Sequence, residues 1–203
     1  MKISKLLLAT VGASVLLGGL ASTTSARNFS LSNQTISTMW SSVEFELPGG
    51  AVRCELTIEG SFHSRTAAKV IGSLVGLITK AILGPCHVPG TVTILSATLP
   101  WHVRYSGFEG GLPNITSTIA HVIGASFRAA NTSVNCLSFS TEARPAIGIF
   151  HRNPVTREIT EAGLSGRLPT RSECLGIEGT FRSDSGAVSL LGTSNVRITL
   201  TLI

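Results

Sequence analysis

Residues 53–63, RCELTIEGSFH, alternate without a break between two kinds of side chain. Polar or charged residues occupy the odd-numbered positions. The other positions hold Cys54, Leu56, Ile58, Gly60 and Phe62. Because successive side chains of a strand point to opposite faces, this pattern predicts a strand with one buried and one solvated face.

A second alternating segment, residues 42–47, precedes this strand, and Pro48-Gly49-Gly50 separates the two. The arrangement predicts a β-hairpin whose two apolar sets face the same side of the sheet. Proline cannot adopt the positive φ of a primed two-residue turn, so a four-residue loop is expected. That register places Glu46 opposite Arg53.

The period changes between Thr66 and Leu83, where apolar residues recur at intervals of three and four. Lys69 and Lys80 lie on a narrow polar stripe at the complementary spacing. Ser64 is placed to cap a helix, and Gly84-Pro85 is a helix stop signal. The segment 66–83 is therefore predicted to be an amphipathic helix packed against the sheet.

Most of the remaining chain has the composition and alternation of short strands. The segment 114–128 fits either a helix or a strand, and its Thr and Ser content favours a strand. The strand candidates are 91–98, 101–105, 114–128, 133–140, 146–150, 156–160, 187–191 and 196–202. We expect a mainly β protein, an antiparallel sandwich or barrel-like sheet with one packed amphipathic helix.

The pattern Ile-Glu-Gly-(Ser/Thr)-Phe occurs twice, at 58–62 and 177–181, each time a few residues after a cysteine. We interpret it as two strands that use similar residues, because sequences of period two resemble one another. The second copy is one residue shorter between the cysteine and the isoleucine. A bulge at Gly176 would keep both on the inner face.

The N-terminal region has the features of a secretory signal peptide. Lys2 and Lys5 precede an apolar run over 6–21, and small residues lead to Ala26. The run is shorter than the roughly 20 residues of a membrane-spanning helix. We expect cleavage after Ala26, with Ala21 as the other option. The mature chain, 27–203, would then be a single secreted or extracytoplasmic domain with no stable transmembrane segment.

Charge and composition limit the partners of the mature chain. It has 14 basic and 11 acidic residues, a net charge of +3, and these are scattered along the sequence. A nucleic-acid-binding surface would cluster Lys and Arg on one face, so we expect no nucleic-acid partner. Asp184 is the single aspartate, which weighs against calcium loops. The compact leader and the preference for Arg over Lys favour a bacterial source.

An even number of cysteines in an exported chain predicts disulfides, because the compartment is oxidising. No Cys-x-x-Cys pair occurs, so a zinc knuckle or a thioredoxin-like site has no support. Four cysteines allow three pairings. We favour Cys54 with Cys86 and Cys136 with Cys174, since each pair closes a loop of moderate length.

Two groups of polar residues have side chains of the kinds found in hydrolytic active sites. Glu59, Ser61 and His63 share one strand face, but a triad needs the histidine between the serine and the acid, and no Gly-x-Ser-x-Gly elbow is present. Glu44 and Glu46 are spaced like the carboxylates of some inverting glycosidases, about 7 Å apart. Any solvated strand with two glutamates gives that spacing. We therefore assign no catalytic residue.

Metal, cofactor and glycan sites receive equally little support. The five histidines show no metal-binding spacing, so no metal and no cofactor are expected. Trp101 and Tyr105 share a strand face on which a sugar ring could stack. Val103 lies between them, however, and makes that face resemble core.

The sequence therefore predicts an exported, non-catalytic β-rich protein that acts by binding or as a structural component. Its partner would be a glycan or protein of the cell envelope or the extracellular space. The first alternative is a secreted hydrolase with a site assembled from distant residues. The second is a membrane-inserting or pore-forming protein that uses the 66–83 helix.

Overall fold

The computed structural model describes residues 28–48, 50–87, 90–132, 134–171, 174, 178–193 and 196–203. The predicted signal peptide over 1–26 and the predicted bulge at Gly176 lie outside these residues. In chain order the elements are β1 (Asn28–Leu31), β2 (Thr35–Leu47), β3 (Gly50–Phe62), β4 (Thr66–Ala68), β5 (Leu74–His87), β6 (Thr91–Ile94), the 3-10 helix η1 (Ser96–Thr98), β7 (Trp101–Gly111), β8 (Asn114–Ile123), β9 (Ser126–Ala130), β10 (Asn135–Phe139), β11 (Ala146–Arg152), β12 (Ile159–Leu168), β13 (Thr170–Arg171), β14 (Gly179–Ser183), β15 (Gly186–Ser189) and β16 (Leu200–Leu202).

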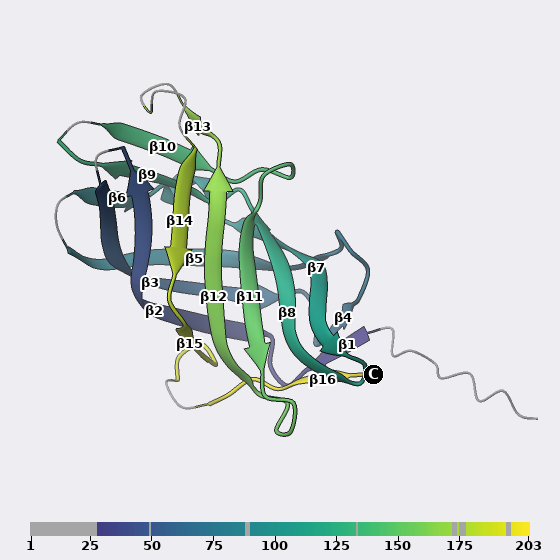
Figure 1. The fold of residues 1–203 in the computed structure, drawn as a ribbon. Coiled ribbons are helices and arrows are strands. Elements are labelled where there is room, and N and C mark those ends of the chain that lie inside the picture. The colour runs from purple at the N-terminus through teal and green to yellow at the C-terminus, as the bar shows by residue number, and fades with distance from the viewer. Residues whose placement is uncertain are drawn as a thin grey trace, which may run out of the picture.

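Nine strands form one antiparallel sheet in the order β11-β8-β7-β5-β3-β2-β14-β12-β15. Strand β11 also pairs with β12, and β15 also pairs with β2, so the sheet curls round to form a barrel-like ring (Figure 1). Strands β14 and β15 lie one after the other between β2 and β12. The mainly β, antiparallel architecture predicted from the sequence is confirmed.

Two smaller sheets lie at opposite ends of this ring (Figure 1). One has the order β16-β1-β4, and the other has the order β13-β10-β9-β6. Phe29 of β1 contacts the ring of Tyr105, and Phe127 of β9 packs between Phe45 and Phe181. Each small sheet therefore adds apolar side chains to the core at its own end.

The predicted hairpin is formed by β2 and β3, and its two apolar sets do face the same side. A bulge after Trp40 shifts the alternation, so that Trp40 and Val43 are both buried. The predicted register is wrong. Leu47 pairs with Gly50, so only two residues connect the strands, and Glu44 rather than Glu46 lies opposite Arg53. Gly50, the first residue of β3 after this connection, has a φ of 148°, which a glycine tolerates.

The predicted helix over 66–83 is wrong, because these residues form β4, a turn and the first part of β5. The helical spacing puts Val70 and Ile71 on a buried face, but they are 62% and 76% exposed. Strand β5 instead pairs with β3 on one side and with β7 on the other. Its β-branched residues Val75, Ile78, Thr79 and Ile82 suit a pleated surface. The membrane-inserting alternative relied on a helix over 66–83, and the structure has strands there instead.

Within the described residues, no helix has the length and hydrophobicity needed to cross a membrane.

The structure contains the disulfides Cys54–Cys86 and Cys136–Cys174, the same pairs that the loop lengths favour. Cys54 and Cys86 lie directly opposite each other on β3 and β5. Disulfides persist in oxidising compartments, so the two bonds indicate an extracytoplasmic location.

Strands β3 and β14, which carry the two similar sequence passages, flank the same strand, β2. Arg53 of β3 and Arg182 of β14 both lie opposite Glu44 of β2. The two similar sequence passages therefore belong to strands on either side of β2, which agrees with their interpretation as two strands of one sheet.

We expect the Cys54→Ala/Cys86→Ala double variant to lose about 3 to 4 kcal/mol of unfolding free energy, because the disulfide closes a loop with a sequence separation of 32. The Cys136→Ala/Cys174→Ala variant should lose a similar amount, since its separation is 38. Urea denaturation of both variants measures the losses. Unfolding free energies equal to that of the parent protein would contradict the prediction.

Candidate functional site

A cavity of about 60 Å³ lies inside the barrel-like ring. Seven of the ring's strands contribute to its wall: β2, β3, β5, β7, β8, β11 and β12. The larger side chains that line it are Ile36, Trp40, Ile58, Phe62, Ile78, Val103, Val122, Phe150 and Leu164. Because the wall comes from most of the ring, the cavity occupies the interior of the barrel rather than a gap between two neighbouring strands.

Small residues at inward positions create this space, namely Gly60, Gly76, Gly148 and Ala162. Gly60 and Gly76 also allow the backbones of β3 and β5 to approach closely. A Cβ atom at Gly60 would lie 2.5 Å from the Leu77 carbonyl oxygen, and one at Gly76 would lie 2.6 Å from that of Ser61. Gly148 differs, because the nearest atom to a Cβ there, on the Phe150 ring, is 3.7 Å away.

The cavity wall has few polar groups, and one of them, the Trp40 indole N–H, already has a hydrogen-bond acceptor. Trp40 Nε1 donates a hydrogen bond of 2.8 Å to the Ala162 carbonyl oxygen, which holds the indole ring across β2 and β12. No charged side chain lines the cavity in the described part of the chain. Such a site selects apolar groups, because a charged or polar ligand would lose its hydration without new partners.

The side chains of the cavity wall differ in burial. Ile36, Phe62 and Phe150 are only partly buried, whereas Trp40, Ile58 and Val103 are buried.

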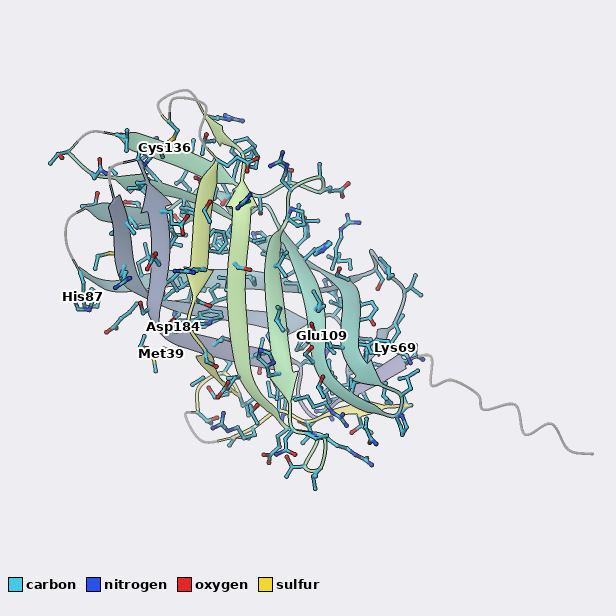
Figure 2. The ribbon with its side chains drawn as sticks, in the orientation of Figure 1. Met39, Lys69, His87, Glu109, Cys136 and Asp184 are labelled. Atoms are coloured by element: carbon cyan, nitrogen blue, oxygen red, sulfur yellow. A yellow bond between two sulfur atoms is a disulfide. The ribbon has the colours of Figure 1, made fainter. Side chains whose placement is uncertain are left out.

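Of the two neighbouring glutamates on β2, Glu44 lines a surface groove, together with Ser42, Arg53, Arg182, Ser183 and Asp184, whereas Glu46 does not. Arg53 Nη2 and Nε each lie 2.7 Å from Glu44 Oε2, and Arg182 Nη2 lies 3.7 Å from Glu44 Oε1. Glu46 pairs in register with Ala51. Asp184, labelled in Figure 2, marks the position of this groove. Glu44 is thus engaged in a surface ion pair with two arginines.

The structure separates the surroundings of Glu59, Ser61 and His63, because Ser61 borders the interior cavity. Glu59 accepts a hydrogen bond of 3.3 Å from Lys80 Nζ on the neighbouring strand, and His63 is exposed. Glu59 and His63 therefore show the pattern of a solvated strand face.

The structure brings together a serine and a histidine that sequence reasoning missed. Ser106 Oγ lies 2.9 Å from His121 Nε2, and the two residues belong to β7 and β8. Ser106 lies at an irregularity, because the β7–β8 register runs from Tyr105 to Gly107 without it. Among the described residues no carboxylate forms a hydrogen bond with His121, so the pair lacks the third member of a triad. Only the β7–β8 register, which is a long-range property, brings the two together.

Trp101 and Tyr105 are buried, at 3% and 7% exposed, so this face belongs to the core, as Val103 between them indicated, and offers no surface for a sugar ring. Trp101 Nε1 donates a 2.9 Å hydrogen bond to Thr98 Oγ1 of η1. Burial also raises the pKa of the Tyr105 phenol. No cluster of three or more His, Cys, Asp and Glu side chains that could hold a metal occurs in the described chain.

No protein-family model, curated protein sequence or solved structure matches this chain. The functional argument therefore rests on the geometry of the cavity and of the surface groups.

We expect Gly60→Ala to destabilise the protein by more than about 2 kcal/mol. The new Cβ atom would collide with the Leu77 carbonyl oxygen, a backbone atom of the paired strand β5. Gly148→Ala is the matched control. The new methyl group would make ordinary contacts, and the unfolded chain would lose entropy, so its stability should stay within about 1 kcal/mol of the parent. Thermal and urea unfolding measure both. Equal losses in the two variants would contradict the packing described here.

Proposed function

We propose that the mature chain is an exported, non-catalytic binding protein of the cell envelope or extracellular space, and that its barrel interior receives the end of an apolar chain. The observation that carries the proposal is the apolar cavity lined by seven strands of the ring. The two disulfides and the signal-like leader support export, and the preference for Arg over Lys supports a bacterial source.

The size of the cavity argues for a chain end rather than a complete ligand. A cavity of about 150 Å³ lined by aliphatic and aromatic side chains holds one benzene molecule, and this cavity has about 60 Å³. Two or three methylene groups fit such a volume and would contribute about 2 kcal/mol at roughly 0.8 kcal/mol each. That energy alone corresponds to a dissociation constant above about 1 mM. The remainder of the ligand would therefore lie against Ile36, Phe62 and Phe150.

A secreted hydrolase with a site assembled from distant residues is the second candidate, and the Ser106–His121 hydrogen bond favours it. This pair has the nucleophile-to-base contact of covalent catalysis. It lacks an orienting acid among the described residues, and neither residue lines the interior cavity. An esterase activity of the mature protein that Ser106→Ala abolishes would favour this candidate over binding.

The binding proposal is tested by titrating ¹⁵N-labelled mature protein with 1-octanol and following the amide resonances of β2, β3 and β11. We expect saturable shifts at these strands. Gly148→Leu places a side chain in the cavity and should weaken octanol binding by at least tenfold. Gly148→Val serves as a smaller step should the leucine variant fold poorly.

Gly107→Leu is the matched control for the titration. Gly107 of β7 does not line the interior cavity, and a Cβ atom there would meet no other atom within 4 Å. This variant should bind octanol as the parent does. Undiminished binding by both Gly148 variants, or octanol shifts confined to other strands, would overturn the proposal.

A further inference from the structure

A separate hollow of about 160 Å³ lies where the β11–β12 turn, the β7–β8 turn and β16 meet. In Figure 1 these three segments lie together at the end of the barrel that carries the small sheet β16-β1-β4. Its lining includes Pro113, Asn114, Arg152, Arg157, Thr201 and Leu202. None of these residues lines the interior cavity, so the two spaces have different walls.

Arg152 is the buried wall of this hollow, with 6% of its surface exposed. Its Nε donates to the Leu200 carbonyl oxygen at 2.8 Å, and its Nη1 donates to that of Ile115 at 2.9 Å. Both acceptors are neutral, and no carboxylate lies within ion-pair distance of Arg152 in the described chain. A buried charge without a partner of opposite sign is costly.

A second guanidinium group belongs to the same hollow. Arg157 lines it beside Arg152, and no carboxylate among the described residues forms an ion pair with Arg157 either. Burial, and next the charge of Arg157, lower the pKa of the Arg152 guanidinium. Two cations therefore share one small space.

The backbone at Arg157 is held in an unfavourable conformation. Its φ is 64°, in the left-handed region that favours glycine and asparagine. Asn153 fixes the turn, because its Oδ1 accepts hydrogen bonds from Val155 and Thr156 and its carbonyl oxygen accepts one from Arg157. The Arg157 carbonyl oxygen in turn accepts a hydrogen bond from Leu200. The turn thus fixes an arginine, rather than a residue that suits its backbone, at the rim of the hollow.

We propose that this hollow binds a tetrahedral oxyanion, a phosphate or sulfate group, between the guanidinium groups of Arg152 and Arg157. The planar fork of guanidinium donors matches the oxygen atoms of such groups. Asn114 and Thr201 supply further polar side chains at the rim. The bound anion would neutralise the repulsion between the two arginines and compensate the buried charge of Arg152.

The test is a calorimetric titration of the folded mature protein with inorganic phosphate and with sulfate, at constant ionic strength set by sodium chloride. We expect saturable binding at one site. Arg157→Asn removes the charge but retains a residue that tolerates the left-handed backbone, and it should weaken phosphate binding at least tenfold while the melting temperature without phosphate stays equal or rises.

Arg128→Gln is the matched control, since it removes one charge from an exposed arginine on β9, in the small sheet at the other end of the barrel. It should bind phosphate as the parent does. Absence of saturable binding would overturn the proposal. An equal loss of phosphate affinity in Arg128→Gln and Arg157→Asn would show only general charge attraction and would overturn it as well.

Two further arms distinguish the source of the phosphate group. Vesicles of phosphatidylcholine with phosphatidic acid present a lipid phosphate monoester, and glycerol 3-phosphate presents a soluble one. Arg157-dependent binding to the vesicles assigns the site to a lipid headgroup, whereas Arg157-dependent binding to the soluble ester alone assigns it to a free metabolite. Binding in either arm that does not depend on Arg157 contradicts the assigned site.

Discussion

The pairing of β11 with β12 is the interaction on which the rest of the molecule depends, because it joins the two ends of the large sheet. Without it, β11 and β12 would each present unpaired backbone N–H and C=O groups along one edge. Closure satisfies those groups and also limits the room inside the ring. The inward positions must then share a confined space, and Gly60, Gly76, Gly148 and Ala162 occupy part of it. The interior cavity is a consequence of small residues within a closed wall.

Closure of the ring creates a second requirement, which is to cover its two ends. The sheet β13-β10-β9-β6 brings Phe127 against Phe45 and Phe181 at one end. The sheet β16-β1-β4 brings Phe29 against Tyr105 at the other. The disulfides follow the same division: Cys54–Cys86 joins two adjacent strands of the ring, and Cys136–Cys174 ties β10 of an end sheet to the segment before β14. The ring and one of its two end sheets are therefore each stabilised by a disulfide.

The sequence predicted those parts of the fold that depend on neighbours in the chain. The alternation over 53–63 was sufficient for β3, because a half-buried strand imposes period two on its own residues. The segment 66–83 was mispredicted because its Val, Ile, Leu and Ala residues satisfy a period of three to four by composition alone. Its pairing with β3 and β7 decides the structure, and that pairing is invisible in the segment itself. The hairpin register was predicted wrongly because a four-residue loop was assumed, whereas Leu47 pairs with Gly50.

The candidate sites were less accessible to sequence reasoning than the strands, since each is assembled by long-range register. Ser106 and His121 meet only because β7 and β8 pair in one register, and the residues lining the interior cavity come from seven strands. The two polar groups that the sequence did single out, around Glu44 and around Glu59, are adjacent in the chain because they share a solvated strand face. The Glu44 carboxylate forms ion pairs with Arg53 and Arg182, and the Glu59 carboxylate forms one with Lys80.

The distribution of charge sets Arg152 apart from the other charged side chains of the described chain. The ion pairs of the described chain join side chains at the surface, where such a pair contributes about 1 kcal/mol or less. Stability must therefore come from the apolar core, the closed hydrogen-bonded ring and the disulfides. Arg152 is the exception, as the one charged side chain that is buried among the described residues, and it bonds to neutral carbonyl groups of β8 and β16. A methionine or leucine could fill that space without burying a charge, so packing alone does not account for the guanidinium group. Its position beside Arg157, in a hollow with no carboxylate, is instead what recognition of an anion requires.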